Sequence, residues 1–126
     1  MPQLPGRHQT PCVLIVDPDH AEFAQTAGAL GTLAIELLHA RTAAEALLRA
    51  QQKRIDLMLC EAKLPDMEGL ELCERLRRVS PTMAMILFTA ERHVAPRPGV
   101  DVPVLPKQDG TGPLVRLVRD HFALAA

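Results

Sequence analysis

The segment Asp56–Gly69, DLMLCEAKLPDMEG, contains the features that decide the fold. The apolar run LMLC predicts a short buried strand, and this strand ends directly before Glu61. The residues that follow include Pro65, a second acidic cluster and Gly69, which indicate a turn before the next helix. An acid that directly follows a buried strand raises the question of whether its carboxylate takes part in chemistry.

Working outward from this segment, strands and helices are predicted to alternate along the chain. Apolar runs predict four further strands, at residues 12–17, 34–40, 83–88 and 102–105. Capping-box patterns at Asp19 and Thr42 precede two predicted helices, the first reaching Ala34 and the second covering residues 44–52. Two more helices are predicted over residues 70–79 and from Pro113 onward. Alternating elements form βαβ units, so the sequence predicts an α/β fold with a doubly wound parallel sheet.

The predicted buried faces of the last two helices follow from helical spacing. They consist of Leu72, Leu76 and Val79 in the first of these helices, and of Leu114, Leu117, Val118 and Phe122 in the second.

Length and composition favour one globular domain and exclude several functional classes. The chain has 126 residues, 48% of them apolar, which is enough for a single hydrophobic core. The net charge of −1 gives no basic footprint of a nucleic-acid binder, and the three cysteines lack metal-ligand spacing. No apolar run is long enough to span a bilayer, and the N-terminus lacks a signal-peptide core, so a cytoplasmic location is expected. Residues 1–11 are expected to form a mobile tail, and residues 12–126 the domain.

Four polar residues stand where predicted strands end: Asp17, Glu61, Thr89 and Lys107. Ligands of open parallel sheets bind just beyond the carboxyl ends of the strands, so these side chains are expected to share one pocket. The two acids could bind Mg²⁺, while the hydroxyl and the ammonium could contact a phosphoryl group.

These stretches resemble a known family. Four segments are similar to the landmarks of response-regulator receiver domains from two-component signalling. They are CVLIVDPDHAEF, DLMLCEAKLPDMEGLELCERLR, MAMILFTA and VLPK. The resemblance extends from Cys12 to Phe122. It implies a flavodoxin-like fold with a five-stranded parallel sheet in the order 2-1-3-4-5, flanked by five helices. It also implies transfer of a phosphoryl group from a histidine kinase to an aspartate, with Mg²⁺ held by neighbouring acids.

The resemblance places Glu61 at the phosphoacceptor position, Thr89 at the switch hydroxyl and Lys107 at the phosphate-pairing lysine. The carboxylate of a glutamate is displaced by roughly 1.5 Å relative to that of an aspartate, and in-line transfer depends on positioning. Of the family's acidic pair, Asp17 matches the first member, but the second is Pro18, which has no oxygen ligand in its side chain.

The metal site is therefore expected to hold Asp17 at most and to be non-functional. No cofactor is expected, and Mg²⁺ stays open as the one candidate. Asp19 is a weaker candidate and could cap a helix instead. Lys63 is a second candidate cation for the acids, although its place in a loop favours an exposed residue.

The switch side of the family pattern also changes. Lys107 follows Thr89 by 18 positions, fewer than receivers usually have, and the segment contains Pro96, Pro98 and Pro103. Because the residue before a proline avoids helical angles, the fourth helix is predicted to be shortened or missing. Val104 stands at the family's aromatic switch position.

These departures favour a degenerate receiver, or pseudo-receiver, that is not an enzyme and acts by phosphorylation-independent protein contact. Its expected partner is a protein, a histidine kinase or a downstream effector, with no direct nucleic-acid or membrane contact. The chain holds no effector domain after its last helix, so it is expected to be a single-domain regulator or the receiver portion of a longer protein.

Two alternatives remain open. In the first, the receiver operates with relaxed chemistry and another acid, Asp66 or Glu68, accepts the phosphoryl group. In the second, the chain is a Mg²⁺-dependent phosphohydrolase, because LIVDPD resembles the strand end of haloacid-dehalogenase-type phosphatases. The Gly-Thr pair that usually follows that motif is absent.

Overall fold

The computed structural model describes residues 10–125, so most of the expected N-terminal tail, residues 1–9, lies outside the described part. Five parallel strands form one sheet in the order β2-β1-β3-β4-β5, which confirms the expected topology. The strands are β1 (Cys12–Val16), β2 (Glu36–Ala40), β3 (Leu57–Cys60), β4 (Ala84–Thr89) and β5 (Val104–Pro106). The helices are α1 (His20–Leu30), α2 (Ala43–Gln52), α3 (Gly69–Val79) and α4 (Gly112–His121), with a 3-10 turn η1 (Lys107–Asp109).

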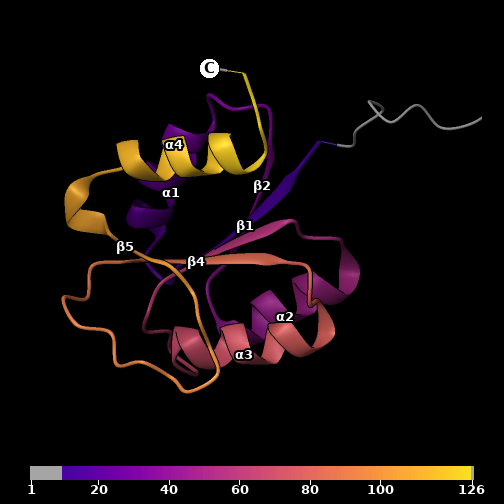
Figure 1. Cartoon of the computed structure of the whole chain (residues 1–126), viewed down its shortest axis with the longest axis vertical. Helices are drawn as coiled ribbons and strands as arrows, with labels where there is room; N and C mark the ends of the chain where they lie inside the picture. Colours follow the sequence, from indigo (N-terminus) through magenta and orange to yellow (C-terminus); the bar gives the residue numbers. More distant parts are fainter. Residues whose placement is uncertain (1–9, 126) are drawn as a thin grey trace, which may run out of the picture.

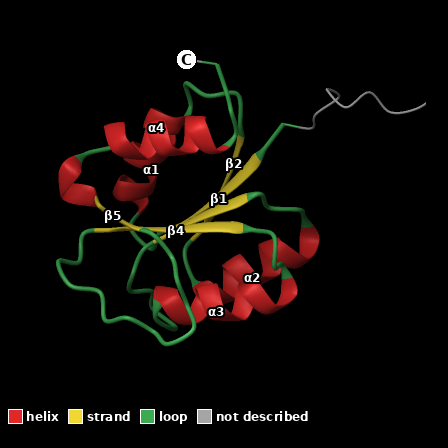
Figure 2. Cartoon of the chain, in the orientation of Figure 1, coloured by secondary structure: helices red, strands yellow, loops and turns green. Residues whose placement is uncertain are grey.

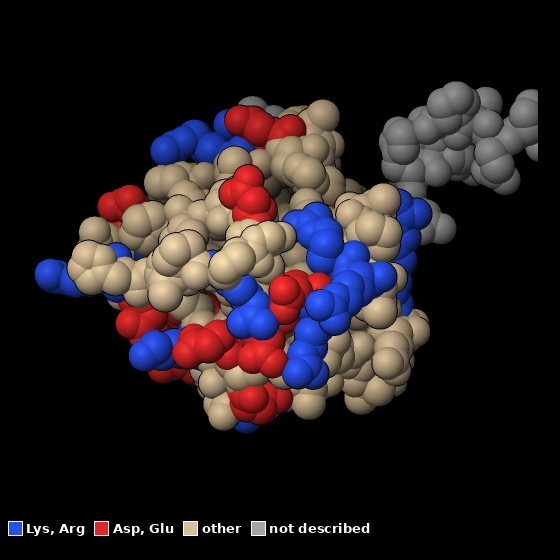
Figure 3. Space-filling model, turned by 60° about the horizontal axis from the view of Figure 1, so that its bottom comes forward, with Lys and Arg blue, Asp and Glu red and all other residues tan. Residues whose placement is uncertain are grey.

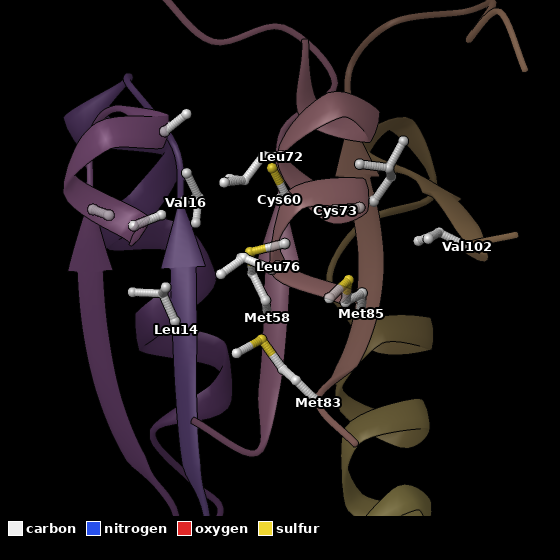
Figure 4. Packing of buried hydrophobic residues seen from close by; sticks show 14 of the residues in the cluster. Leu14, Val16, Met58, Cys60, Leu72, Cys73, Leu76, Met83, Met85 and Val102 are labelled. Atoms are coloured by element: carbon white, nitrogen blue, oxygen red, sulfur yellow. The ribbon is translucent and has the colours of Figure 1, made fainter. Parts of the chain in front are cut away.

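The helices cover both faces of the sheet. Helices α1 and α4 lie on one face, and α2 and α3 lie on the other (Figure 1). The central strands β1 and β3 are buried along their whole length, and their residues alternate between two apolar clusters. Figure 4 shows the cluster under α3, where Met58 and Cys60 of β3 lie beside Leu72 and Leu76. No helix within residues 10–125 has the length and apolar character needed to cross a bilayer.

Side-chain caps define where the first two helices begin. The Asp19 carboxylate accepts the Glu22 N–H at 2.9 Å, and the Thr42 hydroxyl accepts the Glu45 N–H at 3.1 Å. The prediction that the first helix reaches Ala34 is wrong, because α1 ends at Leu30. Gly31 follows as its C-cap, donating its N–H to the carbonyl of Ala27.

Two residues predicted to be buried are exposed instead. Val79 is 69% exposed because it is the last residue of α3, where the chain turns toward β4. Leu117 is 40% exposed because Leu114 and Val118, one turn apart, form the buried stripe of α4 and Leu117 lies at its margin.

The helix that the family pattern has between the fourth and fifth strands is missing, which confirms the prediction that it is shortened or missing. The five helices of that pattern are reduced to four α-helices in residues 10–125. Residues 90–103 form a loop that passes beside α3, visible in Figure 2 as the long connection after β4. Three prolines in this segment disfavour helical angles, and Gly99 has a positive φ of 79°. The loop is fastened to α3 by Arg97, whose guanidinium lies 2.8 Å from the Glu74 carboxylate.

The outer strand β5 is short: it begins two residues later and ends one residue later than the predicted strand 102–105, so it contains Pro106. The carbonyl of the preceding Pro103 accepts the N–H of Leu87, so this residue faces β4. Backbone groups alternate in direction along a strand, so Val104 and Pro106 face outward.

Candidate functional site at the carboxyl edge of the sheet

The four residues predicted to share a pocket lie together. Asp17 and Glu61 directly follow β1 and β3, Thr89 is the last residue of β4, and Lys107 directly follows β5. All four are largely buried: Asp17 is 4% and Thr89 1% exposed, and the side chains of Lys107 and Glu61 are 10% and 13% exposed. We refer to this set of four as the ion cluster.

Lys107 pairs with both acids of the ion cluster. Its ammonium lies 2.7 Å from Asp17 Oδ2 and 2.9 Å from Glu61 Oε2. The other oxygen, Glu61 Oε1, accepts hydrogen bonds from the Thr89 hydroxyl and from the Ala62 N–H, the latter at 2.8 Å. The glutamate carboxylate therefore contacts both Thr89 and Lys107, the residues that the resemblance places at the switch hydroxyl and the phosphate-pairing lysine.

The remaining acceptors of the cluster are also occupied. Asp17 Oδ1 accepts the N–H of Asp19 at 2.9 Å, and the Thr89 hydroxyl oxygen accepts the N–H of Glu91 at 3.0 Å. Burial lowers the pKa of Lys107, but hydrogen bonds to Asp17 and Glu61 outweigh this effect and raise the pKa above its usual value. Lys107 is therefore a charged ammonium that compensates two buried carboxylates.

The donor set does not fit a divalent cation such as Mg²⁺. Pro18 contributes no side-chain oxygen, and both oxygens of Asp17 already accept hydrogen bonds. Asp19 cannot replace the missing acid in its present orientation, because its carboxylate caps α1. No group of three or more His, Cys, Asp or Glu side chains within residues 10–125 is arranged to hold a metal ion. Mg²⁺ requires near-octahedral oxygen ligands, which this arrangement does not offer.

The two other weak candidates lie outside the cluster. The side chain of Lys63 is 69% exposed and stands 4.0 Å from Glu91, so it does not compensate the buried acids. Val104 in β5 is 46% exposed and contributes, with Thr89, to the lining of a cavity of about 660 Å³ beside the loop after β4.

The acids of the loop after β3 have structural contacts of their own. Both oxygens of Asp66 accept backbone N–H groups at 2.9 Å, from Ala43 and Ala44 in the first turn of α2. These bonds lower the pKa of Asp66. Glu68 directly precedes α3 and makes no side-chain cap. Sequence reasoning placed Asp66 in a turn but did not find its contact with α2, because the two segments are 22 or more positions apart.

Gly69 positions the backbone around Glu61. Its N–H donates to the Ala62 carbonyl at 2.7 Å, and a Cβ at this position would lie 2.4 Å from the Glu61 carbonyl oxygen. A side chain would therefore displace α3 from the strand end that carries Glu61.

His39 is a neighbour of the cluster that the sequence did not indicate. Its Nε2 donates to the backbone carbonyl of Asp17 at 2.9 Å, and its ring stacks on Phe23 with centroids 3.7 Å apart. These contacts hold the end of β1 against β2 and α1.

Comparison with known proteins assigns the chain to a family. The family model for the response regulator receiver domain matches residues 13–97, which is more than half of the chain. The chain belongs to this family. A response regulator receiver protein of Anaeromyxobacter sp. strain Fw109-5, Anae109_2439, is 40% identical over 83 residues. The response regulator receiver protein CpdR of Brucella abortus is 26% identical over 91 residues.

Solved structures support the same assignment. The signal receiver domain of an HD domain-containing protein from Pseudomonas fluorescens has a TM-score of 0.83 and 26% identity, covering 91% of this chain and 96% of that one. The response regulator TrrA of Thermotoga maritima, solved in complex with Mg²⁺ and BeF, shares the fold, with a TM-score of 0.80, 21% identity and coverage of 88% and 98%. The matched segments span 65% of this chain and 34% of the Anaeromyxobacter protein, and 72% of this chain and 76% of CpdR.

Proposed function

We propose that this receiver domain does not accept a phosphoryl group and signals through protein contacts, with Glu61 in the place of a phosphorylated side chain. The observation that carries the proposal is the double contact of Glu61, which accepts the Thr89 hydroxyl at one oxygen and the Lys107 ammonium at the other. Incoming phosphate would have to displace a carboxylate that already satisfies both groups. Residues 12–126 are proposed as the receiver unit.

Charge supports only partial mimicry. The carboxylate of Glu61 contributes one negative charge beside Lys107, whereas a phosphoryl group contributes nearly two. Asp17 adds a second carboxylate on the same ammonium, at 2.7 Å. The cluster therefore has a fixed electrostatic state that does not depend on a kinase. The proposed partner is a protein, a histidine kinase or a downstream effector, and the proposed location is the cytoplasm.

The two alternatives lack an observation in their favour. Asp66 is the loop acid closest in type to a phosphoacceptor, and both of its oxygens are bonded to α2. For the phosphohydrolase, Asp19 would act as a general acid, and its carboxylate caps α1.

The test is a ¹⁵N–¹H NMR titration with Mg²⁺ and then with beryllofluoride, a mimic of the phosphoryl group. We expect no saturable shifts at the amides of Asp17, Glu61, Thr89 and Lys107 in the wild-type domain. Saturable shifts there at millimolar or lower concentration would establish an operating pocket and overturn the proposal.

Two variants make the titration decisive. Glu61→Asp alone is expected to remain silent, because Pro18 leaves the metal site one acid short. The double variant Pro18→Asp with Glu61→Asp restores both acids and is expected to respond. A response of Glu61→Asp alone would mean that the glutamate, and not the metal site, closes the pocket.

A further inference from the structure

A basic surface lies at the amino-terminal edge of the sheet, at the opposite end of the molecule from the ion cluster. Here α2 and α3 end on the same face of the sheet (Figure 1). Figure 3, in which this face is turned forward, shows Lys and Arg side chains gathered toward the side where the two helices end. We define the basic edge as Arg49, Lys53, Arg54, Arg75, Arg77 and Arg78.

The carboxylates around the basic edge compensate only part of its charge. Lys53 pairs with Glu36 at 3.0 Å, Arg54 with Asp56 at 3.4 Å, and Arg75 with Glu71 at 2.9 Å. Asp56 also accepts the N–H of Cys12, so its charge is shared. Arg49, Arg77 and Arg78 make no ion pair with any residue in 10–125.

Helix dipoles account for some of these cations but not for the whole surface. Arg49, Arg77 and Arg78 lie in the last turns of their helices, where a positive charge is favourable. The helix dipole does not explain Arg54, because this residue lies after the end of α2 and its side chain is 83% exposed. Nor does it explain Val79, a large apolar residue that is 69% exposed at the end of α3.

A hollow with both polar and apolar lining residues lies within the basic edge. Its volume is about 330 Å³, and Val79 contributes to its lining together with the buried side chains of Ile55 and Met83. Lys53 and Arg54 line the same hollow, and so does Asp56, the ion-pair partner of Arg54. The exposed apolar side chain of Val79, with cations on the same lining, fits an apolar side chain whose sequence neighbours are acidic.

We propose that the basic edge binds an acidic segment of a protein partner, which inserts an apolar side chain into the hollow beside Val79. Arg78 faces the carboxylates of that segment, since it has no partner within the described chain. The proposal rests on the proposed function only in that the output of the domain is protein contact. Its test does not involve the ion cluster, so either proposal can fail alone.

The experiment uses the full chain labelled with ¹⁵N and a short synthetic peptide of glutamates flanking a central leucine. We expect saturable amide shifts confined to residues 54–56 and 78–83. Replacing the leucine by serine, or the glutamates by glutamines, is expected to weaken binding. Arg78→Glu and Val79→Ser are each expected to weaken it by about tenfold, and both change exposed side chains, so the fold is retained. The matched control is Arg92→Glu, with the same charge change in the loop after β4.

Three results would overturn the proposal. Shifts that spread over the surface without saturating would indicate non-specific attraction. Equal weakening by Arg92→Glu and Arg78→Glu would indicate an effect of net charge alone. If the domain binds phosphatidylglycerol vesicles but not the peptide, and Arg78→Glu abolishes the binding of vesicles, the surface recognises lipid headgroups instead of protein.

Discussion

Residues 12–89 and residues 90–106 are built differently, although they belong to one sheet. In the first region each of β1, β2 and β3 is followed by a capped or packed helix, and the strands β1 and β3 are buried throughout. In the second, a loop replaces the helix, and cavities of about 660, 520 and 510 Å³ border it. Even so, Lys107, the residue directly after this region, is only 10% exposed and pairs with both acids. The site thus depends on where β5 ends and not on the helix before it.

The largest effect is expected from Lys107→Met. Removing the ammonium leaves Asp17 and Glu61 as buried carboxylates without a cation, a change that destabilises proteins by about 3 to 5 kcal/mol. Lys63→Met is the matched control, because the same chemical change at a side chain that is 69% exposed should alter stability little. Urea unfolding at neutral pH measures both. Similar free energies of unfolding for the two variants would show that the ion pairs of Lys107 do not contribute to stability.

The same ion pair predicts alkaline sensitivity in the wild type. The folded-state pKa of Lys107 is raised above its usual 10.5, because its hydrogen bonds to the two acids outweigh burial. Its contribution to stability is therefore complete below pH 10.5 and is lost as the pH rises through the higher folded-state pKa. The Lys107→Met variant should lack this step.

Gly69→Ala tests the better-ordered region. The new methyl group would lie 2.4 Å from the Glu61 carbonyl oxygen, so α3 or the strand end must move. We expect a loss of about 3 kcal/mol, the upper part of the range for overpacking. Gly28→Ala in α1 is the control, since no atom other than the adjacent residues and backbone of α1 itself lies within 4 Å of the new methyl group; it should stabilise by roughly 0.5 to 1 kcal/mol. Equal effects in thermal unfolding would contradict the close approach at Gly69.

Asp66→Asn is expected to have a smaller, pH-dependent effect. Both oxygens accept N–H groups at the start of α2, whereas an asparagine has one acceptor oxygen and no charge, so the change should cost roughly 0.3 to 1 kcal/mol at neutral pH. Because the pKa of Asp66 lies below the usual 3.8 in the folded protein, this contribution is present above pH 3.8 and is lost as the pH falls through the lower folded-state value. Unfolding at pH 7 and at pH 3 compares the two proteins. A difference that persists unchanged in acid would assign the effect to packing.

Arg97→Ala is expected to have the smallest effect on stability, and it tests how the loop after β4 is held against α3. Its ion pair with Glu74 joins the loop to α3, but both side chains are partly exposed, so global stability should change little. Hydrogen exchange should accelerate at residues 94–101 and remain unchanged in β1 and β3. Arg92→Ala, in the same loop but without an ion pair in residues 10–125, should leave exchange unchanged. Faster exchange in both variants would remove any special role for Arg97.

The sequence predicted the ion cluster because two visible patterns intersect. Each of Asp17, Glu61 and Thr89 ends a recognisable apolar run, and parallel strands bring such ends to one edge. The missing helix was predictable for a local reason, since prolines act on the angles of their own neighbours. Both signals are contained in a few consecutive residues.

Other features depended on side-chain direction or distant contacts and could not be predicted. The Asp66 carboxylate reaches the start of a helix that precedes it in the chain, and His39 bonds to a carbonyl of the neighbouring strand. Val79 and Leu117 have the right spacing for a buried face, but Val79 is the last residue of α3 and Leu117 lies at the margin of the buried stripe of α4. Periodicity predicts on which face of a helix a side chain lies, but not whether another part of the protein covers it there.

Pro106 in β5 has a consequence for how this chain behaves when crowded. An open sheet edge is a template on which another chain can add a strand, and repeated addition leads to aggregates. Here the edge strand has three residues, and of its two outward positions only Val104 has an N–H to donate, because a proline nitrogen carries no hydrogen. This edge of the sheet therefore offers few backbone donors to an added strand, and fibrous assembly through it is disfavoured.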